Sequence, residues 1–233
     1  MALPKLSQPI FTLTMPSSGK KVKYRQFTVK EEKILLTAQA SGGKEDMIEA
    51  FKQLITNCCL DDIDVDKMPA FDIEYFFLQL RAKSVSDVIK LSFTEEDGEK
   101  AEAEIKLSEL QVHKPTVSNK VLLSEEQGIG VVLRYPTFSM IEKMADLDDK
   151  DPTTSLQLFK MIIESIYDAD AVYPSEDSAP GELDEFVLSL NNLQVSKIQA
   201  FLEDMPYVYI DVKYTVKGVE KEQRVRGMEN FFV

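Results

Sequence analysis

The feature that most constrains the fold is an abrupt change of periodicity between residues 22 and 36, VKYRQFTVKEEKILL. Up to Phe27 apolar and polar side chains alternate, a pattern typical of a half-buried β-strand. Thr28 and Glu31 then have the Thr-x-x-Glu spacing of a capping box, in which the hydroxyl and the carboxylate each satisfy a backbone amide at a helix start. The sequence therefore predicts a strand that passes into a helix at Thr28.

The first half of the chain predicts a hairpin, three helices and a second hairpin. Alternating segments at 9–15 and 20–27 flank a Gly-containing turn, as in a β-hairpin. Apolar residues at helical spacing and stop signals such as Ser41-Gly-Gly43 delimit the helices. The helices are expected at 28–40, 44–58 and 72–82, and the second hairpin at 88–93 and 101–107.

After a polar connector, a similar order recurs. Strands are expected at 121–123 and 130–135, helices at 138–145, 154–167, 182–190 and 196–204, and a final hairpin at 208–216 and 220–225. Arg25-x-x-Thr28 recurs as Arg134-x-x-Thr137 at an offset of 109 residues, and Phe51-Lys recurs as Phe159-Lys at an offset of 108. Two similar offsets in corresponding elements indicate an internal duplication.

These patterns predict an α+β protein of two related lobes, each with β-hairpins flanking a small helical bundle. The expected boundaries are 1–112 for the hairpin-helices-hairpin lobe, 113–120 for a linker, and 121–233 for a related lobe with an extra helix. A chain of 233 residues is long enough for two domains of ordinary size.

Charge narrows the classes of partner. Forty acidic residues against 27 basic ones give a net charge of -13, which repels phosphate backbones and anionic membrane surfaces. No apolar run approaches the roughly 20 residues that span a bilayer, and the first residues lack the apolar core of a signal peptide. We therefore expect a cytosolic protein that binds neither nucleic acid nor membrane.

The residues that most often carry catalysis are scarce. His113 is the single imidazole, and it lies in the expected linker, where it lacks the partners that orient a general base. Cys58 and Cys59 are adjacent, which suits neither a disulfide framework nor separated zinc ligands, so burial at a helix end is favoured. No catalytic residue and no cofactor are predicted.

Asp62, Asp64 and Asp66 resemble the start of a calcium loop, because a hard cation binds several oxygens at short spacing. The resemblance fails further along, where Lys67 replaces the turn Gly and Ile73 replaces the bidentate Glu. A solvated acidic loop is therefore favoured, and no metal site is predicted. A metal-dependent hydrolase that uses these carboxylates remains the rival from a different functional class.

Aromatic clusters provide candidates for partner binding. Three consecutive aromatic residues on the third expected helix span more of its circumference than one core stripe requires, and the chain ends in Asn-Phe-Phe-Val. The predicted partner-binding residues are Tyr75, Phe76, Phe77, Phe231 and Phe232. The alternative is that both clusters fill the intramolecular core, because a Phe side chain buries a large apolar area.

Residues 4–93 resemble the baseplate hub assembly proteins of T-even-type tailed bacteriophages. The shared pattern is a Leu-Ser-x-Pro start, a Gly-Lys turn, Arg-x-Phe and a Lys-Glu-Glu-Lys helix start. In this chain these motifs are Leu6 to Pro9, Gly19-Lys20, Arg25 to Phe27 and Lys30 to Lys33.

The resemblance implies a non-enzymatic protein that is required to assemble the central hub of a contractile phage tail baseplate. Its implied partners are other phage baseplate hub proteins, and its implied location is the host cytoplasm during virion assembly. An alternative is a stoichiometric structural subunit that remains in the tail baseplate of the virion. The resemblance carries over no catalytic residue, and the oligomeric state stays open.

Overall fold

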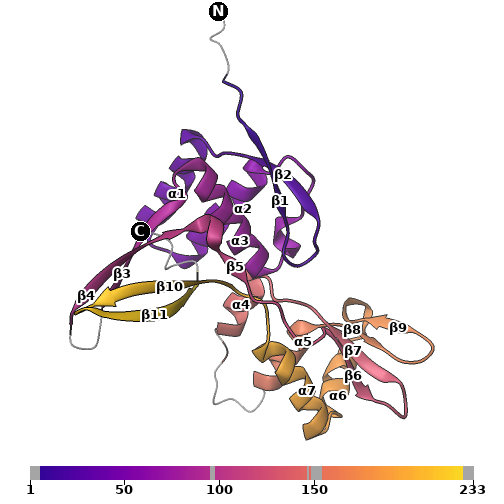
Figure 1. Cartoon of the computed structure of the whole chain (residues 1–233). Coiled ribbons are helices and arrows are strands. Elements are labelled where there is room, and N and C mark those ends of the chain that lie inside the picture. The colour runs from indigo at the N-terminus through magenta and orange to yellow at the C-terminus, as the bar shows by residue number, and fades with distance from the viewer. Residues whose placement is uncertain (1–5, 95–97, 146, 148–153, 228–233) are drawn as a thin grey trace, which may run out of the picture. The chain divides into compact units, whose positions relative to one another are not determined.

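The computed structural model describes residues 6–94, 98–145, 147 and 154–227. The chain divides into two compact units, which we call the first unit (residues 1–113 and 207–233) and the second unit (residues 114–206). Each unit combines helices with antiparallel sheets (Figure 1), so the expected α+β class is confirmed. Within the described residues no helix has both the length and the apolar character needed to cross a membrane.

Among its described residues, the first unit contains three helices and three small antiparallel sheets. Its sheets have the strand orders β1-β2, β3-β4 and β11-β10-β5. In chain order its elements are β1 (Ile10–Thr14), β2 (Lys21–Arg25), α1 (Val29–Ser41), α2 (Lys44–Cys58), the 3-10 turn Val65–Lys67, α3 (Ala70–Ser84), β3 (Val88–Thr94), β4 (Lys100–Lys106), the 3-10 turn Leu107–Glu109, β5 (Gln111–Val112), β10 (Val208–Val216) and β11 (Val219–Arg226).

Helix α3 forms the centre of the first unit's core. It buries residues on most of its circumference, which is typical of a helix enclosed by other elements. Phe76 packs against Tyr24 of β2 with ring centroids 5.4 Å apart, and Phe77 packs against Phe51 of α2 at 4.6 Å. These contacts hold the first hairpin and α2 against α3.

The last hairpin completes the first unit. Strand β10 pairs with β5 through Val208↔Val112 and Tyr209↔Gln111. In Figure 1 this hairpin lies beside β3 and β4, and the rings of Phe93 and Tyr214 stack with centroids 4.3 Å apart. The division expected from the sequence placed all of 121–233 in the second lobe, whereas the structure groups 207–233 with the first unit.

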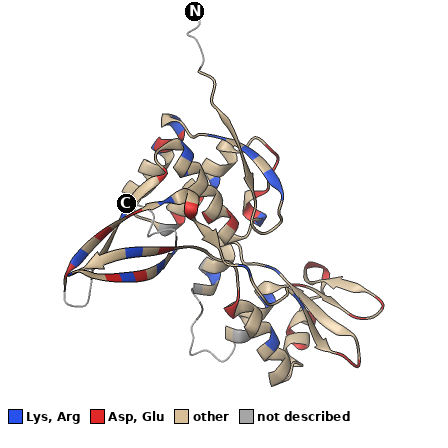
Figure 2. Ribbon diagram, viewed as in Figure 1, with Lys and Arg blue, Asp and Glu red and all other residues tan. Residues whose placement is uncertain are grey.

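Charged residues recur along β3–β4 and β10–β11, as the blue and red bands of Figure 2 show, and most of them are exposed. Cross-strand pairs of opposite charge form there: Lys90 lies 3.6 Å from Glu104, and Arg224 lies 2.8 Å from Asp211. Such pairs add modest stability to a sheet. Charges on an edge strand also discourage unwanted pairing with other chains.

The described part of the second unit contains a four-stranded antiparallel sheet with the order β6-β7-β8-β9. Its hydrophobic core contains Val131 and Leu133 of β7 together with Phe159, Ile198 and Phe201 of the surrounding helices. Its elements are β6 (Lys120–Ser124), β7 (Ile129–Leu133), α4 (Phe138–Ala145), α5 (Thr154–Ile162), β8 (Ile163–Tyr167), β9 (Val172–Pro174), the 3-10 turn Ser175–Asp177, α6 (Glu182–Leu188) and α7 (Asn192–Glu203).

One expected element is wrong. The helix predicted over 154–167 ends at Ile162, and the residues from Ile163 to Tyr167 form the strand β8, which pairs with β7 and β9. The sequence gives no local signal for this change, because a short apolar run is compatible with both periodicities. Pairing with a strand on each side makes these residues a strand. The neighbouring strand β9 was not predicted either. The proposed relation between the two lobes is not confirmed and stays a prediction.

Candidate functional site

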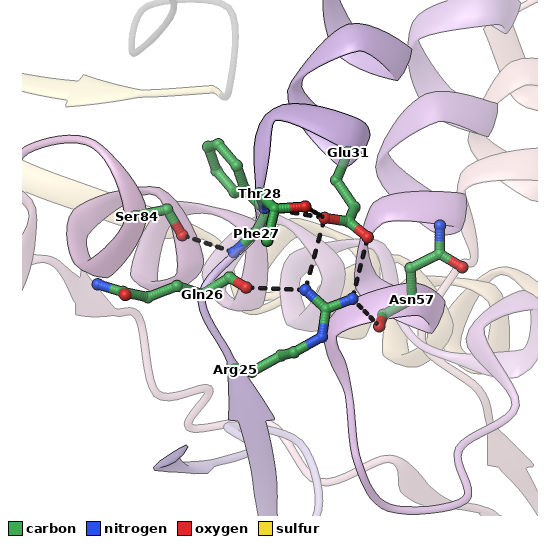
Figure 3. Close-up of polar contacts among 7 residues, drawn as sticks. All are labelled: Arg25, Gln26, Phe27, Thr28, Glu31, Asn57 and Ser84. Carbon is green, nitrogen blue, oxygen red and sulfur yellow. Dashed lines mark hydrogen bonds and ion pairs between the residues drawn. The ribbon is translucent and has the colours of Figure 1, made fainter. Parts of the chain in front are cut away.

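The junction between β2 and α1 holds a cluster of polar contacts (Figure 3). Thr28 has the extended conformation of a helix N-cap, and its backbone N–H donates to Glu31 Oε2 at 2.8 Å. Its hydroxyl donates to the same oxygen at 2.6 Å. The Thr-x-x-Glu spacing therefore forms the capping box expected from the sequence.

Arg25, the last residue of β2, connects this cap to a second helix. Its Nη2 donates to Glu31 Oε1 at 2.9 Å and to the carbonyl of Asn57 at 2.9 Å, while Nη1 donates to the carbonyl of Gln26 at 2.9 Å. Asn57 lies in the last turn of α2, where the final carbonyls have no intrahelical partner. The guanidinium therefore joins the start of α1 to the end of α2.

The electrostatics of the junction favour ionised partners. Burial alone raises the pKa of Glu31, but the hydrogen bonds from Arg25 and Thr28 outweigh this effect and lower the pKa to about 2. The hydrogen bond to Glu31 in turn raises the pKa of Arg25. A carboxylate held ionised at neutral pH has no proton to donate, and as a base it is weak. The junction is therefore suited to fastening three elements together.

The corresponding Arg134 junction of the second unit uses different partners. Arg134 Nη2 donates to the carbonyl of Ile163 at 3.3 Å and to Ser175 Oγ at 3.1 Å. Thr137 Oγ1 accepts from the backbone N–H of Met140 at 3.4 Å. Because Met140 stands where the first unit has its capping Glu, no carboxylate from this position reaches Arg134. This arginine instead joins the start of β8 to the turn after β9.

A second buried carboxylate was not predicted from the sequence. Asp72, in the first turn of α3, is 2% exposed and accepts hydrogen bonds from the backbone N–H of Ser17, at 3.0 Å, and from the Ser17 hydroxyl. Burial raises the pKa of Asp72, and the Ser17 hydrogen bonds oppose this rise. The contact joins the first hairpin turn to α3 across 55 residues, a separation that no local pattern reports.

The predicted aromatic candidates lie in different environments. Phe76 and Phe77 are 0% and 1% exposed, so their side chains fill the core of the first unit and offer no free surface. Tyr75 is half-buried, and burial raises its pKa. Phe231 and Phe232 lie outside the described residues. Of the three candidates among the described residues, Tyr75 is the one that lies partly at the surface.

The acidic residues after α2 are engaged by lysines. Asp66 Oδ1 lies 3.0 Å from Lys52 Nζ, and Asp64 Oδ2 lies 3.6 Å from Lys67 Nζ. Asp62, Asp64 and Asp66 line an open hollow beside α2. Among the residues that the structure describes, no group of three potential His, Cys, Asp or Glu ligands is arranged to hold a metal ion.

His113 and the two cysteines occupy structural positions. The imidazole of His113 stacks on Tyr207 with ring centroids 5.0 Å apart, and the backbone N–H of His113 donates to the Tyr207 carbonyl at 2.9 Å. Cys58 is buried, as expected, and burial raises the pKa of its thiol to about 11. Cys59 is half-buried, and burial raises its pKa as well. Thiols with raised pKa values are poor nucleophiles at neutral pH.

Comparison with known proteins assigns the chain to a protein family. The model of the family described as "T4 bacteriophage base plate protein" matches residues 8–233. No curated protein and no solved structure matches the chain. The family match extends well beyond the N-terminal motifs and covers both units. The chain belongs to the T4 bacteriophage base plate protein family.

Proposed function

We propose that the protein acts in assembly of the central hub of a contractile phage tail baseplate, through protein–protein contacts and without catalysis. The observation that carries this proposal is the family match over residues 8–233. Its direct partners would be other baseplate hub proteins, and it would act in the host cytoplasm during virion assembly. The net charge of -13 favours partners with basic surfaces, because opposite fields steer association.

The chemistry of the described groups supports a non-enzymatic role. The buried carboxylates Glu31 and Asp72 each contact residues of neighbouring elements. Both join elements of the first unit. A docking protein needs rigid units with accessible surfaces, and tuned acid–base groups would add nothing to that role.

A second candidate has support from the same family description, since a base plate protein can remain in the particle as a stoichiometric subunit. Mass spectrometry of purified virions separates the two. An assembly factor is expected to be absent from virions, whereas a structural subunit is present in fixed copy number. Both proposals predict that phage lacking the gene fail to complete the baseplate hub, and normal hubs in that phage would refute both.

Co-purification tests the partner class. Tagged protein from infected cells is expected to retain baseplate hub proteins. Glu substitutions of Phe231 and Phe232, with Tyr75→Glu as a separate variant, test the aromatic candidates that stay predictions. Circular dichroism shows whether each variant is still folded. Undiminished recovery of hub proteins with folded variants would remove these residues from the docking surface.

The metal-dependent hydrolase is the enzymatic rival. Metal analysis of protein purified without chelator tests whether the protein holds a metal ion. Less than one equivalent of calcium, magnesium or zinc is expected, because Lys52 and Lys67 already neutralise Asp66 and Asp64. Stoichiometric metal that is lost with Asp62→Asn would revive that alternative.

A further inference from the structure

Strand β9 forms an open edge of the second unit's sheet. It pairs with β8 on one side and ends the strand order β6-β7-β8-β9. All three of its residues are exposed, and the exposed fractions of Val172 and Tyr173 are 63% and 48%. An exposed edge strand with apolar side chains is a template for pairing with another chain.

The hydrogen-bonding pattern between β8 and β9 determines which backbone groups of β9 point away from the sheet. The backbone N–H of Asp168 donates to the carbonyl of Ala171 at 3.1 Å at the end of the β8–β9 hairpin. In an antiparallel ladder hydrogen-bonded and non-hydrogen-bonded pairs alternate. The pairs of Val172 and of Pro174 with β8 are therefore the non-hydrogen-bonded ones. The N–H and C=O of Val172 and the C=O of Pro174 face away from the sheet.

The opposite edge of the same sheet is covered. The carbonyls of Leu122 and Leu123 in β6 accept hydrogen bonds from Lys197 Nζ at 2.7 Å and Gln194 Nε2 at 3.4 Å, both from α7. Side chains of helix α7 thus already bond carbonyls in the second half of β6. Among the described residues, no side chain bonds the outward N–H or C=O of Val172.

The β9 strand is held in an extended conformation before any partner binds. Tyr173 Oη donates to Asp168 Oδ2 at 2.9 Å, and the other oxygen of Asp168 accepts two backbone N–H groups of the hairpin turn. Beyond the strand, Ser175 Oγ donates to the carbonyl of Glu164 and accepts from Arg134. A preorganised edge lowers the entropic cost of binding.

Charge identifies the class of occupant. Residues 161–196 contain eight Asp or Glu residues and no Lys or Arg, and β9 lies in this segment (Figure 2). The strand is flanked by Asp168 and Asp170 before it and by Glu176 and Asp177 after it. Four carboxylates around an open edge attract a segment that carries Lys or Arg, and they repel an acidic one.

We propose that the β9 edge binds an extended, basic segment of another baseplate protein, which adds a fifth strand to the sheet. The outward N–H and C=O of Val172 supply two main-chain hydrogen bonds, the usual source of affinity in strand addition, while the Pro174 carbonyl lies at the start of the 3-10 turn that follows. The flanking carboxylates select Lys and Arg side chains at the ends of the added strand. This inference rests on the proposed assembly role, because it names the chemistry of one partner contact.

Two pairs of variants test the edge. Val172→Pro removes the outward N–H and leaves the β8 ladder intact, since that N–H makes no bond to β8, while Val172→Thr keeps the N–H and is the matched control. Asp170→Lys with Asp177→Lys removes the net negative charge of the flanking side chains, because two Lys then balance Asp168 and Glu176. Glu220→Lys with Glu222→Lys makes the same change of net charge on β11 of the first unit and is its control.

The assay is carboxyl-to-amine cross-linking of the tagged protein in infected cells, followed by mass spectrometry of the joined peptides. The expected result is a set of links from Asp168 or Glu176, the two flanking carboxylates that every variant keeps, to lysines of one phage protein. Val172→Pro and the Asp170→Lys/Asp177→Lys pair should each lower the yield of these links by about tenfold or more, as loss of main-chain and ionic contacts implies. The two controls should keep the yield of the unmodified protein.

Complementation separates failure of this inference from failure of the proposed function. If phage lacking the gene build normal hubs, the assembly role itself is refuted. If that phage are defective and are restored fully by both edge variants, the assembly role stands and the β9 contact is refuted. Links to the first unit alone would also overturn the contact. Unchanged links in Val172→Pro would overturn strand addition at this edge, because the contact would then not depend on the outward N–H.

Discussion

Arg25 and Glu31 form a partly buried ion pair across the turn from β2 to α1, with Nη2 and Oε1 2.9 Å apart. The side chain of Glu31 is 3% exposed and that of Arg25 is 24% exposed. Removing one member of such a pair leaves a buried charge without its partner, which costs more than the pair contributes as a whole. Arg25 also bonds the carbonyl of Asn57, so its loss affects α2 as well.

Arg25→Met is expected to lower the free energy of unfolding by about 2–4 kcal/mol, because it leaves the Glu31 carboxylate buried without its positively charged partner. Adding Glu31→Gln to Arg25→Met should recover part of this loss, since the neutral amide is less costly to bury. Urea denaturation of the wild type, both single variants and the double variant gives the coupling energy. Additive losses would show that the two side chains do not interact.

Acid sensitivity should depend on Glu31. Its folded-state pKa of about 2 lies below the ordinary value of roughly 4.3. A lowered pKa contributes stability that is fully present above the unfolded-state pKa and is lost as the pH falls through the folded-state pKa. The wild-type free energy of unfolding should therefore fall between about pH 5 and pH 2 more steeply than that of Glu31→Gln.

Chemical denaturation at a series of pH values measures the two slopes. Asp72→Asn is a useful comparison, because burial raises the pKa of Asp72 and its contribution therefore has the opposite sign. Its stability contribution is present below the unfolded-state pKa and is lost as the pH rises through the folded-state pKa. Replacing Asp72 should make the acid slope steeper, so equal slopes for both variants would contradict these assignments.

Gly130 should not tolerate a side chain. A Cβ at this position would overlap the ring and hydroxyl of Tyr167 and the carbonyl of Val121. Tyr167 is also covered by Lys120, whose Nζ lies 4.6 Å from the ring centroid. Gly130→Ala is expected to lower the free energy of unfolding by about 1–3 kcal/mol through overpacking. The thermal midpoint and denaturant curves of the variant measure this change.

Tyr167→Ala in the Gly130→Ala background provides the matched test. Because the smaller side chain removes the overlap with the ring, the second substitution should cost less in that background than in the wild type. Equal costs in both backgrounds would show that the Tyr167 ring is not what excludes a side chain at Gly130.

Removal of residues 207–233 should unfold part of the first unit and spare the second. Without β10 the buried side chains of Ile89, Leu91 and Phe93 lose the strand that packs beside β3 and β4. Residues 114–206 have their own core, so as an isolated fragment they are expected to unfold cooperatively. Circular dichroism and hydrogen exchange measure both outcomes.

A single substitution refines the same prediction. Tyr214→Ala, which removes the ring stacked on Phe93, should cost about 3–5 kcal/mol, the range for a large core aromatic. Lys213→Ala, an exposed neighbour on the same strand, is the control and should change stability little. Similar effects of the two substitutions would contradict a structural role for the aromatic stack.

Local patterns determined most of the helices and hairpins of this protein. Thr28 and Glu31 predicted the start of α1, Gly42 its end, and alternation predicted β1, β2, β3 and β4. These signals are local, because a cap or a turn depends on residues three or four positions apart. The N-terminal motifs were also sufficient for the resemblance to phage baseplate proteins, and the match over residues 8–233 confirms that family.

Tertiary structure decided what local spacing cannot encode. Strand β8 follows α5 without a turn because β7 and β9 pair with it on both sides. The aromatic run of α3 suggested a surface, yet Phe76 and Phe77 are buried because hairpin β1–β2 and α2 cover the helix. Strand β10 returns to β5 across about a hundred residues, and such a contact depends on the packing of the whole chain.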